Sequence, residues 1–423
     1  MNFFWFRRDL RLKDNVALYK ATLENGPVIP LFIFDTEIIT SLSKDDARIT
    51  FIYNTLREID AELKKNNSSL LIKIGKPISV WRDLVSQYNI DSVFYNKDYE
   101  PYAIARDLEV SQFLSSKQIN AFSFKDQVIF EEAEVVKENG LPYTVFTPYK
   151  NKWLSKLETI SLVESDPMPN YYRFNSDFPS LKTIGFIESL VKVKPYNLSY
   201  LKNYDSIRDY PFKDQTSYVS PYLRFGLISP RKLVNIALEV NATYLSELIW
   251  REFFMQILFH FPEVVTENFK KNYNQIIWRN SEQEFQKWCK GETGYPIVDA
   301  GMRQLNETGY MHNRVRMITA GFLCKHLLID WRWGEAYFAE KLLDYDLSAN
   351  NGNWQWAAGT GCDAAPYFRI FNPTEQIKKF DKELKYITKW VKELNKTTYP
   401  LPIVEHKFAR DRALSAYKKG LNL

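Results

Sequence analysis

The chain has 423 residues, of which 45% are hydrophobic and 25% charged, a balance typical of a globular protein with a large buried core. No apolar run approaches the roughly 20 residues that span a bilayer, and charge follows the N-terminus too soon for a secretory signal, so we expect an intracellular, cytoplasmic protein. Residues 1–200 hold 25 Lys and Arg against 26 Asp and Glu, whereas residues 201–423 hold 31 against 25. We therefore expect a polyanionic partner to bind the second half, with an ordinary solvated basic surface as the alternative.

Cysteine and histidine are scarce, whereas aromatic residues are abundant. The chain has 3 Cys and 4 His, and their spacing matches neither a disulfide framework nor an HExxH zinc site. We therefore expect no metal. Aromatic residues make up 16% of the chain and include 11 Trp, many of them in polar surroundings where a simple core would use Leu.

The first segment alternates apolar runs with amphipathic stretches. Residues 3–6, 28–34, 70–74, 92–95 and 121–124 are expected to form strands, each followed by helical sequence such as 46–63. This alternation predicts an α/β domain over residues 1–126, with a doubly wound parallel sheet of five strands. No GxGxxG motif follows the first strand, so the ordinary dinucleotide fingerprint is absent.

The later segments differ in character. Residues 127–200 show little periodicity and are expected to form an interdomain linker with some short helices. From residue 201 to 423, helical periodicity dominates, which predicts an all-α domain. The expected helices are 231–240, 244–260, 301–308, 314–329, 334–343 and 375–394.

Two helices are expected to carry mixed polar and aromatic faces. Glu247, Trp250 and Arg251 lie at i, i+3 and i+4, so an acid, an indole and a cation share one face. Asn313, Arg316 and Met317 repeat this spacing, while Arg314 points about 100° away. The two faces could line one pocket, although solvated helix faces remain an alternative for each.

Two further segments are candidates for ligand contacts. Residues 344–356 contain two acids, three Asn, one Gly and two Trp, a set able to orient a polar heterocycle through hydrogen bonds. An aromatic-anchored loop is the alternative. Residues 214–223 place hydroxyl groups before a helix, where a phosphate is favoured, but ordinary N-caps explain such residues equally well.

Several separated motifs occur in one order along the chain. They include 6–11 (FRRDLR), 250–253 (WREF), 294–300 (GYPIVDA), 311–314 (MHNR), 349–352 (ANNG) and 367–373 (YFRIFNP). In this set the chain closely resembles the photolyase/cryptochrome flavoproteins, over almost its whole length. The resemblance implies an α/β domain joined by a long linker to a helical domain that holds a folded FAD without a covalent bond.

The resemblance assigns roles to particular positions. The residues that match the flavin-binding motif are Tyr204, Thr216, Ser217, Val219, Ser220, Glu247, Arg251, Asn313, Arg316, Asp344, Asp346 and Asn350. Asn350 would face the flavin N5, as in the repair enzymes. Trp278, Trp331 and Trp354 match an electron-relay triad that reduces oxidised FAD under light.

The residues that match the lesion pocket favour cyclobutane pyrimidine dimers (CPDs). Glu247, Trp250, Asn313, Met317 and Trp356 match the pocket of CPD photolyases, which indicates a class I enzyme on UV-damaged double-stranded DNA. Arg208, Arg251, Arg314 and Arg369 match positions near the DNA backbone. By this resemblance, light-excited FADH⁻ donates an electron to the flipped dimer, the ring splits, and the electron returns.

The resemblance leaves other questions open. A second, antenna chromophore would be a deazaflavin or flavin rather than a folate, with Arg48, Asp98 and Glu100 as weak candidates. We expect a monomer. A blue-light photoreceptor that signals through a partner, and a flavin electron-transfer protein without a DNA role, remain alternatives to a DNA-repair lyase.

Overall fold

A computed structural model describes residues 1–168 and 170–423, which form two compact units. The first unit comprises Met1–Val136, Lys152–Tyr196 and Tyr218–Val240. The second comprises Lys137–Asn151, Asn197–Ser217 and Asn241–Leu423. The expected linker therefore contributes to both units. Its boundaries as a separate domain segment stay a prediction.

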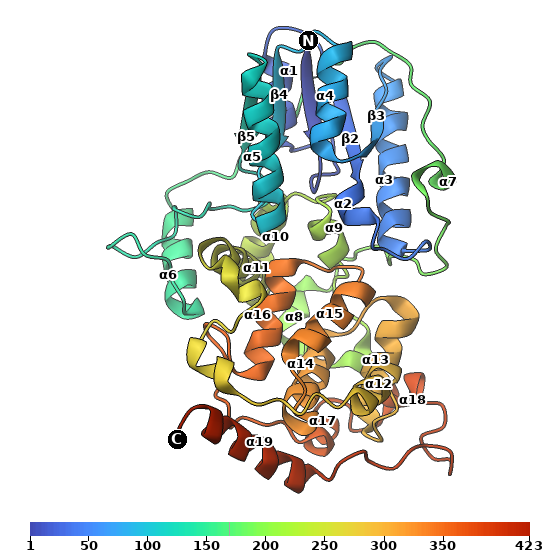
Figure 1. Cartoon of the computed structure of the whole chain (residues 1–423), viewed down its shortest axis with the longest axis vertical. Coiled ribbons are helices and arrows are strands. Elements are labelled where there is room, and N and C mark those ends of the chain that lie inside the picture. Colours follow the sequence, from blue (N-terminus) through green and yellow to red (C-terminus); the bar gives the residue numbers. More distant parts are fainter. Residues whose placement is uncertain (169) are drawn as a thin grey trace. The chain divides into compact units, whose positions relative to one another are not determined.

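The first unit is built on a five-stranded parallel sheet, as the alternation of apolar runs predicts. The strands are β1 (Asn2–Phe6), β2 (Val28–Asp35), β3 (Leu71–Gly75), β4 (Ser92–Asn96) and β5 (Asn120–Phe124). Their order is β3-β2-β1-β4-β5 (Figure 1), so β1 is the point at which the order reverses. Polar residues at the carboxyl end of β1 and β4 are therefore placed where doubly wound sheets bind ligands.

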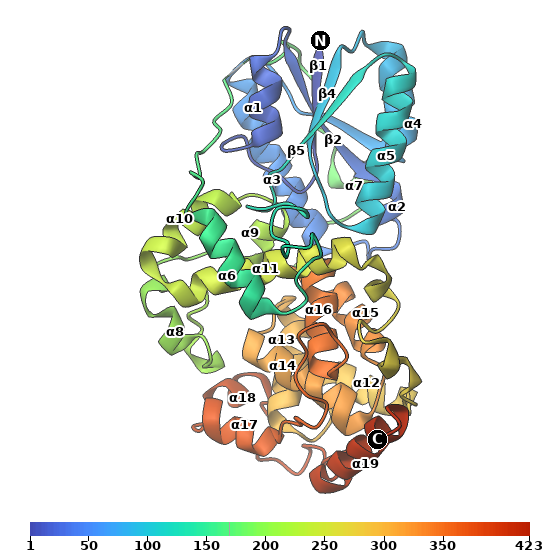
Figure 2. The same ribbon diagram turned by 90° about the vertical axis from the view of Figure 1, so that its left-hand side faces the viewer.

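Helices cover both faces of this sheet, which explains its continuous apolar strands. Helices α1 (Val16–Leu23) and α3 (Ala47–Lys64) pack on one face, and α4 (Pro77–Gln87) and α5 (Pro101–Ser116) on the other (Figure 2). The remaining helices of the unit are α2 (Thr36–Ile39), α7 (Leu181–Ile184), α9 (Ser220–Arg224) and α10 (Pro230–Val240). The range of α6 (Phe146–Leu157) is shared between the units.

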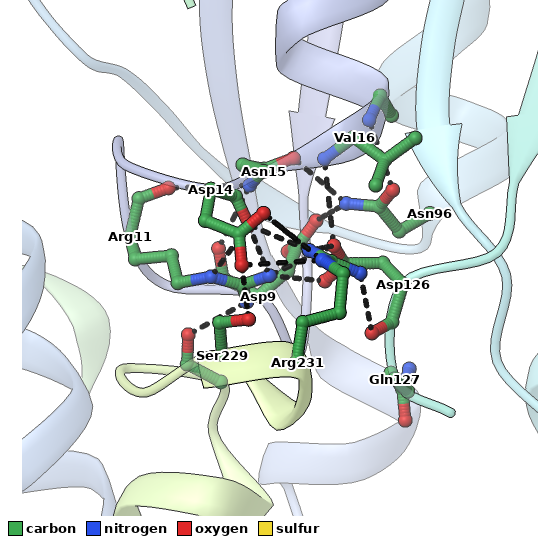
Figure 3. A network of polar contacts seen from close by, with 12 residues as sticks. Asp9, Arg11, Asp14, Asn15, Val16, Asn96, Asp126, Gln127, Ser229 and Arg231 are labelled. Carbon is green, nitrogen blue, oxygen red and sulfur yellow. Dashed lines mark hydrogen bonds and ion pairs between the residues drawn. The ribbon is translucent and has the colours of Figure 1, made fainter. Parts of the chain in front are cut away.

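A buried polar network holds the start of α10 to the loops that follow β1 and β5 (Figure 3). The Asp126 carboxylate accepts hydrogen bonds from Nη2 of Arg11 at 2.7 Å and from Nη2 of Arg231 at 2.8 Å. Asp14 accepts from Nε of Arg231 at 2.9 Å and from the Ser229 hydroxyl. Burial by itself raises the pKa of Asp126, but the two guanidinium groups bring it below its usual value. The two acids and two arginines balance in charge, as buried ions must.

The second unit is helical. Its α-helices are α8 (Tyr204–Ile207), α11 (Ala242–His260), α12 (Glu282–Lys290), α13 (Pro296–Thr308), α14 (Asn313–Gly321), α15 (Trp331–Lys341), α16 (Leu347–Ala358), α17 (Pro373–Phe380), α18 (Lys385–Trp390) and α19 (His406–Gly420). Short 3-10 segments are η1 (Leu201–Asn203), η2 (Pro211–Lys213), η3 (Pro262–Val265) and η4 (Lys271–Gln275), and η5 (Phe322–Leu327) is a π-helix. Helix α16 packs against α11, α14 and α15, so it is central to the unit.

Two helix predictions are wrong in extent. The stretch 375–394 is not one helix, because α17 ends at Phe380 and α18 begins at Lys385. The buried Asp381 between them accepts hydrogen bonds from the backbone N–H groups of Tyr386 and Ile387, which caps α18. The stretch 314–329 is α-helical only to Gly321 and continues as η5. Local periodicity detects the apolar face but not these changes of hydrogen-bonding pattern.

Within the described residues, no helix is both long enough and apolar enough to cross a membrane.

Candidate functional site

Helix α11 presents Glu247 to a short segment that precedes it in the chain. Its carboxylate forms an ion pair with the guanidinium group of Arg208, which lies 5.3 Å over the Tyr204 ring. Burial lowers the pKa of Arg208, but the negative charge of Glu247 raises it above its ordinary value. This pair fixes an acid and a cation, both predicted site residues, beside one aromatic ring.

The indole of Trp250, one turn along α11, is covered on one face. The ring of Phe146 stacks on it at 3.6 Å between centroids and 8° between planes. Phe146 is held in turn by its backbone N–H, which donates to Oδ2 of Asp363 at 3.1 Å. A substrate base can stack only on the part of the indole that Phe146 leaves open, a limit that sequence alone does not reveal.

The predicted hydroxyl cluster is divided between the two units. Thr216 and Tyr310 share a hydrogen bond of 3.0 Å, and the Tyr244 hydroxyl donates to Ser217 at 3.3 Å. These contacts fix the Thr216 and Ser217 side chains within the helical unit. Val219 and Ser220 belong to the first unit, at the start of α9, a helix of five residues. Their role at a phosphate stays a prediction.

Helix α14 carries two arginines that point to different partners. Arg314 binds Oδ1 of Asp209 at 2.7 Å and lies 4.5 Å over the Phe380 ring, while one of its nitrogen atoms is 3.6 Å from the sulfur atom of Met317. Arg316 binds Oδ2 of Asp344 at 2.9 Å. The divergence of the two arginines agrees with the helical spacing of the sequence.

His312 caps α14 and was not among the predicted site residues. Its Nδ1 accepts the backbone N–H of Arg314 at 3.2 Å, so the ring proton is on Nε2. Within the described part of the chain this buried Nε2 has no hydrogen-bond partner. Burial, together with nearby Arg314, lowers the pKa of His312 to about 4, which keeps it neutral. The sequence signal that could have identified it is a histidine at the expected helix N-cap, immediately before Asn313.

Asn350 lies on α16 with its amide orientation fixed. Its Nδ2 donates to the backbone oxygen of Glu335 at 3.1 Å and to the Glu335 carboxyl at 2.8 Å. Burial raises the pKa of Glu335. Since both amide protons are used, Oδ1 is left as an acceptor, and none of the described residues donates to it. Asp346 has a different task, because its Oδ1 accepts the N–H of Ala349 at 3.1 Å and caps α16.

The predicted relay tryptophans differ in burial. Trp354 and Trp331 are 2% and 1% exposed, whereas Trp278 is half-buried and makes an edge contact with Tyr417 at 5.9 Å. Nε1 of Trp331 donates to Oδ1 of Asn268 at 2.8 Å. The burial pattern is compatible with a path that begins in the core and ends near the surface.

The remaining predicted residues are distributed around these helices. Arg251 and Trp356 are half-buried on α11 and α16, and the exposed Arg369 lies 5.8 Å from the Phe371 ring. Helix α16, which carries Asn350, Trp354 and Trp356, packs against both α11 and α14. The structure thus brings the acid of α11, the polar face of α14 and the amide of α16 into one group of helices.

Comparisons with known proteins identify the family of the chain. Residues 2–170 match the sequence model described as DNA photolyase, and residues 244–398 match the FAD binding domain of DNA photolyase. The chain belongs to the DNA photolyase family. It is 37% identical to a deoxyribodipyrimidine photo-lyase of Agrobacterium fabrum, over 98% of this chain and 96% of that protein.

Two solved photolyase structures are also similar to it. A class III photolyase from Agrobacterium tumefaciens is 35% identical with a TM-score of 0.88, covering 100% of this chain and 98% of that one. An archaeal photolyase from Sulfolobus tokodaii, described as having two FAD molecules, is 35% identical with a TM-score of 0.87, covering 99% and 100%.

The donors of this photolyase-family chain fit an FAD. The buried Nε2–H of His312, the Oδ1 of Asn350 and the cation Arg316 offer a donor, an acceptor and a positive charge in one group of helices. Buried polar atoms without a protein partner are rare, so the Nε2–H of His312 is expected to meet a ligand or water. These three groups suit the polar edge of a flavin and its phosphates.

The antenna candidates in the first unit are already engaged. Arg48 binds Asp46, and Asp98 and Glu100 both bind Arg8, at 3.2 and 2.8 Å. Arg224 also binds Glu100, at 3.0 Å. Burial raises the pKa of Asp98, but Arg8 and other arginines bring it below its usual value. Asp98 and Glu100 thus belong to an ion-pair cluster with these two arginines at the carboxyl end of β4, whereas Arg48 and Asp46 pair at the start of α3.

Proposed function

We propose that this chain repairs cyclobutane pyrimidine dimers in DNA under light, as a deoxyribodipyrimidine photo-lyase that uses reduced FAD. The observation that carries the proposal is the 37% identity, over nearly the whole length of both chains, to a protein of that name. The class I subtype comes from the pocket residues and stays a prediction, since one similar structure is described as class III.

FAD would be held mainly by the helical unit. When bound, reduced and light-excited, it supplies the electron that opens the cyclobutane ring. The residues proposed to bind it are Tyr204, Thr216, Ser217, Val219, Ser220, Glu247, Arg251, Asn313, Arg316, Asp344, Asp346 and Asn350. Asn350 contributes a fixed acceptor because Glu335 holds its amide.

The dimer would be bound by the polar faces of α11 and α14. A dimer inside a duplex is inaccessible, so it has to be flipped out, and its poor stacking lowers a cost of roughly a few kcal/mol. Glu247 and Asn313 would hydrogen-bond the pyrimidine carbonyl groups as they gain negative charge. Trp250, Trp356 and Met317 would supply apolar contact, with Phe146 fixing the plane of Trp250.

DNA would be anchored through its phosphates. Arg208, Arg251, Arg314 and Arg369 are the proposed contacts, and such contacts position the duplex without reading its sequence. Arg208 and Arg314 are each paired with an acid in the structure. Both acids are partly exposed, so a phosphate can replace or join them at modest cost.

Two accessory roles belong to the same proposal. Trp278, Trp331 and Trp354 would carry electrons to oxidised FAD under light. A second chromophore would be a flavin or deazaflavin, and the Sulfolobus tokodaii relative, described with two FAD molecules, favours a flavin. The protein would act as a monomer.

The decisive experiment is light-dependent repair. Reduced, FAD-loaded protein is illuminated with a duplex that holds one pyrimidine dimer, and the recovery of pyrimidine absorbance is followed. We expect recovery in the light and none in the dark. A duplex with a (6-4) photoproduct serves as the lesion control and should not be repaired. No recovery at full flavin occupancy would overturn the proposal.

A further inference from the structure

The segment 359–372 joins α16 to α17 without forming a helix or a strand. It carries Arg369, a proposed phosphate contact, which is exposed next to Phe368, itself 62% exposed. The backbone N–H of Arg369 donates to the oxygen of Pro366 at 2.9 Å. The position of the guanidinium group therefore depends on where the backbone of 366–369 is held.

A buried lysine contacts the backbone at both ends of the first part of this segment. Nζ of Lys325, on η5, donates to the backbone oxygen of Ala358 at 2.7 Å and to that of Tyr367 at 3.2 Å. The ring of Tyr417, on α19, has its centroid 3.7 Å from the same nitrogen. Lys325 is only 2% exposed. Two carbonyl oxygens and one ring face match the three N–H donors of an ammonium group.

We propose that Lys325 is a positioning residue for DNA binding, which closes the segment 359–367 and thereby fixes the place of Arg369. The inference rests on the proposed function, because it requires Arg369 to contact a DNA phosphate. A role in stability alone would not require a lysine, since an apolar side chain of similar length avoids the cost of burying an amine. The position of Lys325 on a π-helix agrees with a functional role, because such segments are rare and frequent at functional sites.

The end of α16 provides a suitable place for the charge of Lys325. Among the described residues, no carboxylate forms an ion pair with it. Ala358 is the last residue of α16, so its oxygen lies at the negative end of the helix dipole, where a cation is favoured. Burial lowers the pKa of Lys325 to about 7. The neutral amine keeps two N–H donors, so both carbonyl oxygens are bound in either protonation state.

Tyr417 and Gly359 close the segment tightly around the amine. The Tyr417 hydroxyl also donates to the oxygen of Ala358, at 2.7 Å, and its ring stacks on Tyr367 with 5.9 Å between centroids and 10° between planes. Gly359 has a φ of 84°, and a Cβ atom there would lie 3.3 Å from both Nζ of Lys325 and Cα of Tyr367. The two ends of the segment 359–367 therefore meet at the Lys325 amine.

The first test measures amide hydrogen exchange of the FAD-loaded protein without DNA. Lys325→Met keeps an unbranched side chain and removes its donors, so exchange at residues 359–367 should become about tenfold faster or more, as local opening costs less free energy. Tyr295→Phe is the matched control. It removes a phenolic hydrogen bond to the backbone oxygen of Val404, outside this segment, and should leave exchange at 359–367 unchanged.

A milder variant covers the case in which Lys325→Met does not fold. Tyr417→Phe keeps the aromatic ring and removes one donor to Ala358, so it should speed exchange in the same residues to a smaller extent. Unchanged exchange at 359–367 in Lys325→Met, or in Tyr417→Phe where it has to replace the first variant, would overturn the proposal.

The second test is a double-mutant cycle on the dissociation constant of a dimer-containing duplex. Lys325→Met should raise this constant about tenfold, the equivalent of one charge-assisted contact. If Lys325 acts through Arg369, Lys325→Met/Arg369→Ala should bind about as weakly as Arg369→Ala alone. Arg208→Ala removes a proposed phosphate contact outside the segment, so its effect should add to that of Lys325→Met.

The outcomes separate this inference from the proposed function. Additive effects of Lys325→Met with both arginine variants would show that Lys325 contributes only to stability, and an Arg369→Ala variant with wild-type affinity would remove the contact that Lys325 is inferred to position. Either result overturns the inference. Failure of the wild-type protein to bind and repair the dimer-containing duplex would instead overturn the proposed function and, with it, the role in DNA binding.

Discussion

Glu247 combines an observed ion pair with a proposed contact to the substrate. In the structure its carboxylate binds Arg208, which orients the acid on α11. The same carboxylate is proposed to hydrogen-bond the dimer. Because the ion pair is partly exposed, it contributes little to the free energy of folding. Its main effect is to orient the Glu247 carboxylate.

Replacing Glu247 by Ala should lower the repair yield more than it lowers binding of damaged DNA. Removing a preorganised group that stabilises developing charge costs about tenfold or more in rate. Repair yield per absorbed photon and the dissociation constant of the damaged duplex are measured together. Arg208→Ala is the comparison variant, since it removes the ion pair but keeps the acid; because Arg208 is also a proposed phosphate contact, it should weaken binding more than it lowers the repair yield of bound DNA. An effect of Glu247→Ala confined to affinity would contradict the role.

His312 predicts sensitivity to acid. Its pKa is lowered from 6.5 to about 4, chiefly by burial, so the unfolded chain takes up a proton before the folded one does. The associated stability is fully present above pH 6.5 and is lost as the pH falls through about 4. The loss amounts to roughly 3 kcal/mol. The buried His326, whose pKa is lowered to about 3, acts in the same direction.

The measurement is the free energy of unfolding between pH 7 and pH 4. His312→Asn keeps a side chain that can cap α14. It should reduce the loss of unfolding free energy at low pH by the roughly 3 kcal/mol assigned to His312. An unchanged slope in His312→Asn would exclude His312 as the source.

At the scale of elements, the contact between α15 and α16 depends on one glycine. A Cβ atom at Gly334 would lie 2.1 Å from the Trp354 ring and 2.6 Å from a methyl group of Leu323. Both neighbours are buried. The absence of a side chain at this position therefore sets where Trp354, a member of the predicted relay, can lie.

Gly334→Ala should displace Trp354 and lower stability. Overpacking of a dense core costs about 1–3 kcal/mol, and the rate of FAD photoreduction should fall together with the midpoint of thermal unfolding. Gly321→Ala is the control, because a Cβ there meets its nearest atom at 3.7 Å. An unchanged rate and midpoint in Gly334→Ala would contradict the packing argument.

At the scale of the molecule, the excess of positive charge in the second half predicts a salt-dependent partner. The logarithm of the association constant for duplex DNA should fall linearly with the logarithm of the salt concentration. The slope should be about −0.9 for each phosphate contacted. Arg369→Ala removes one proposed contact and should reduce the slope by about one such increment. Binding is followed by fluorescence anisotropy at several salt concentrations. A slope equal to wild type would remove Arg369 from the interface.

The amount that could be predicted differs between fold and site. The five strands and their alternation with helices were expected because period and composition are local properties. The break at Asp381 was missed because the carboxylate binds backbone groups that follow it, in a conformation that periodicity does not encode. The ordered family motifs supplied the candidate site residues, whose roles stay predictions.

The sequence by itself determined the two structural classes, the chain order of the elements and the residues that resemble a flavin and lesion site. Only the tertiary structure decided that Phe146 covers Trp250, that Glu335 orients Asn350, and that Trp288 contacts Trp354. The physical reason is that hydrophobic period and motif spacing act along the chain. Stacking and hydrogen bonding depend on which distant segments meet.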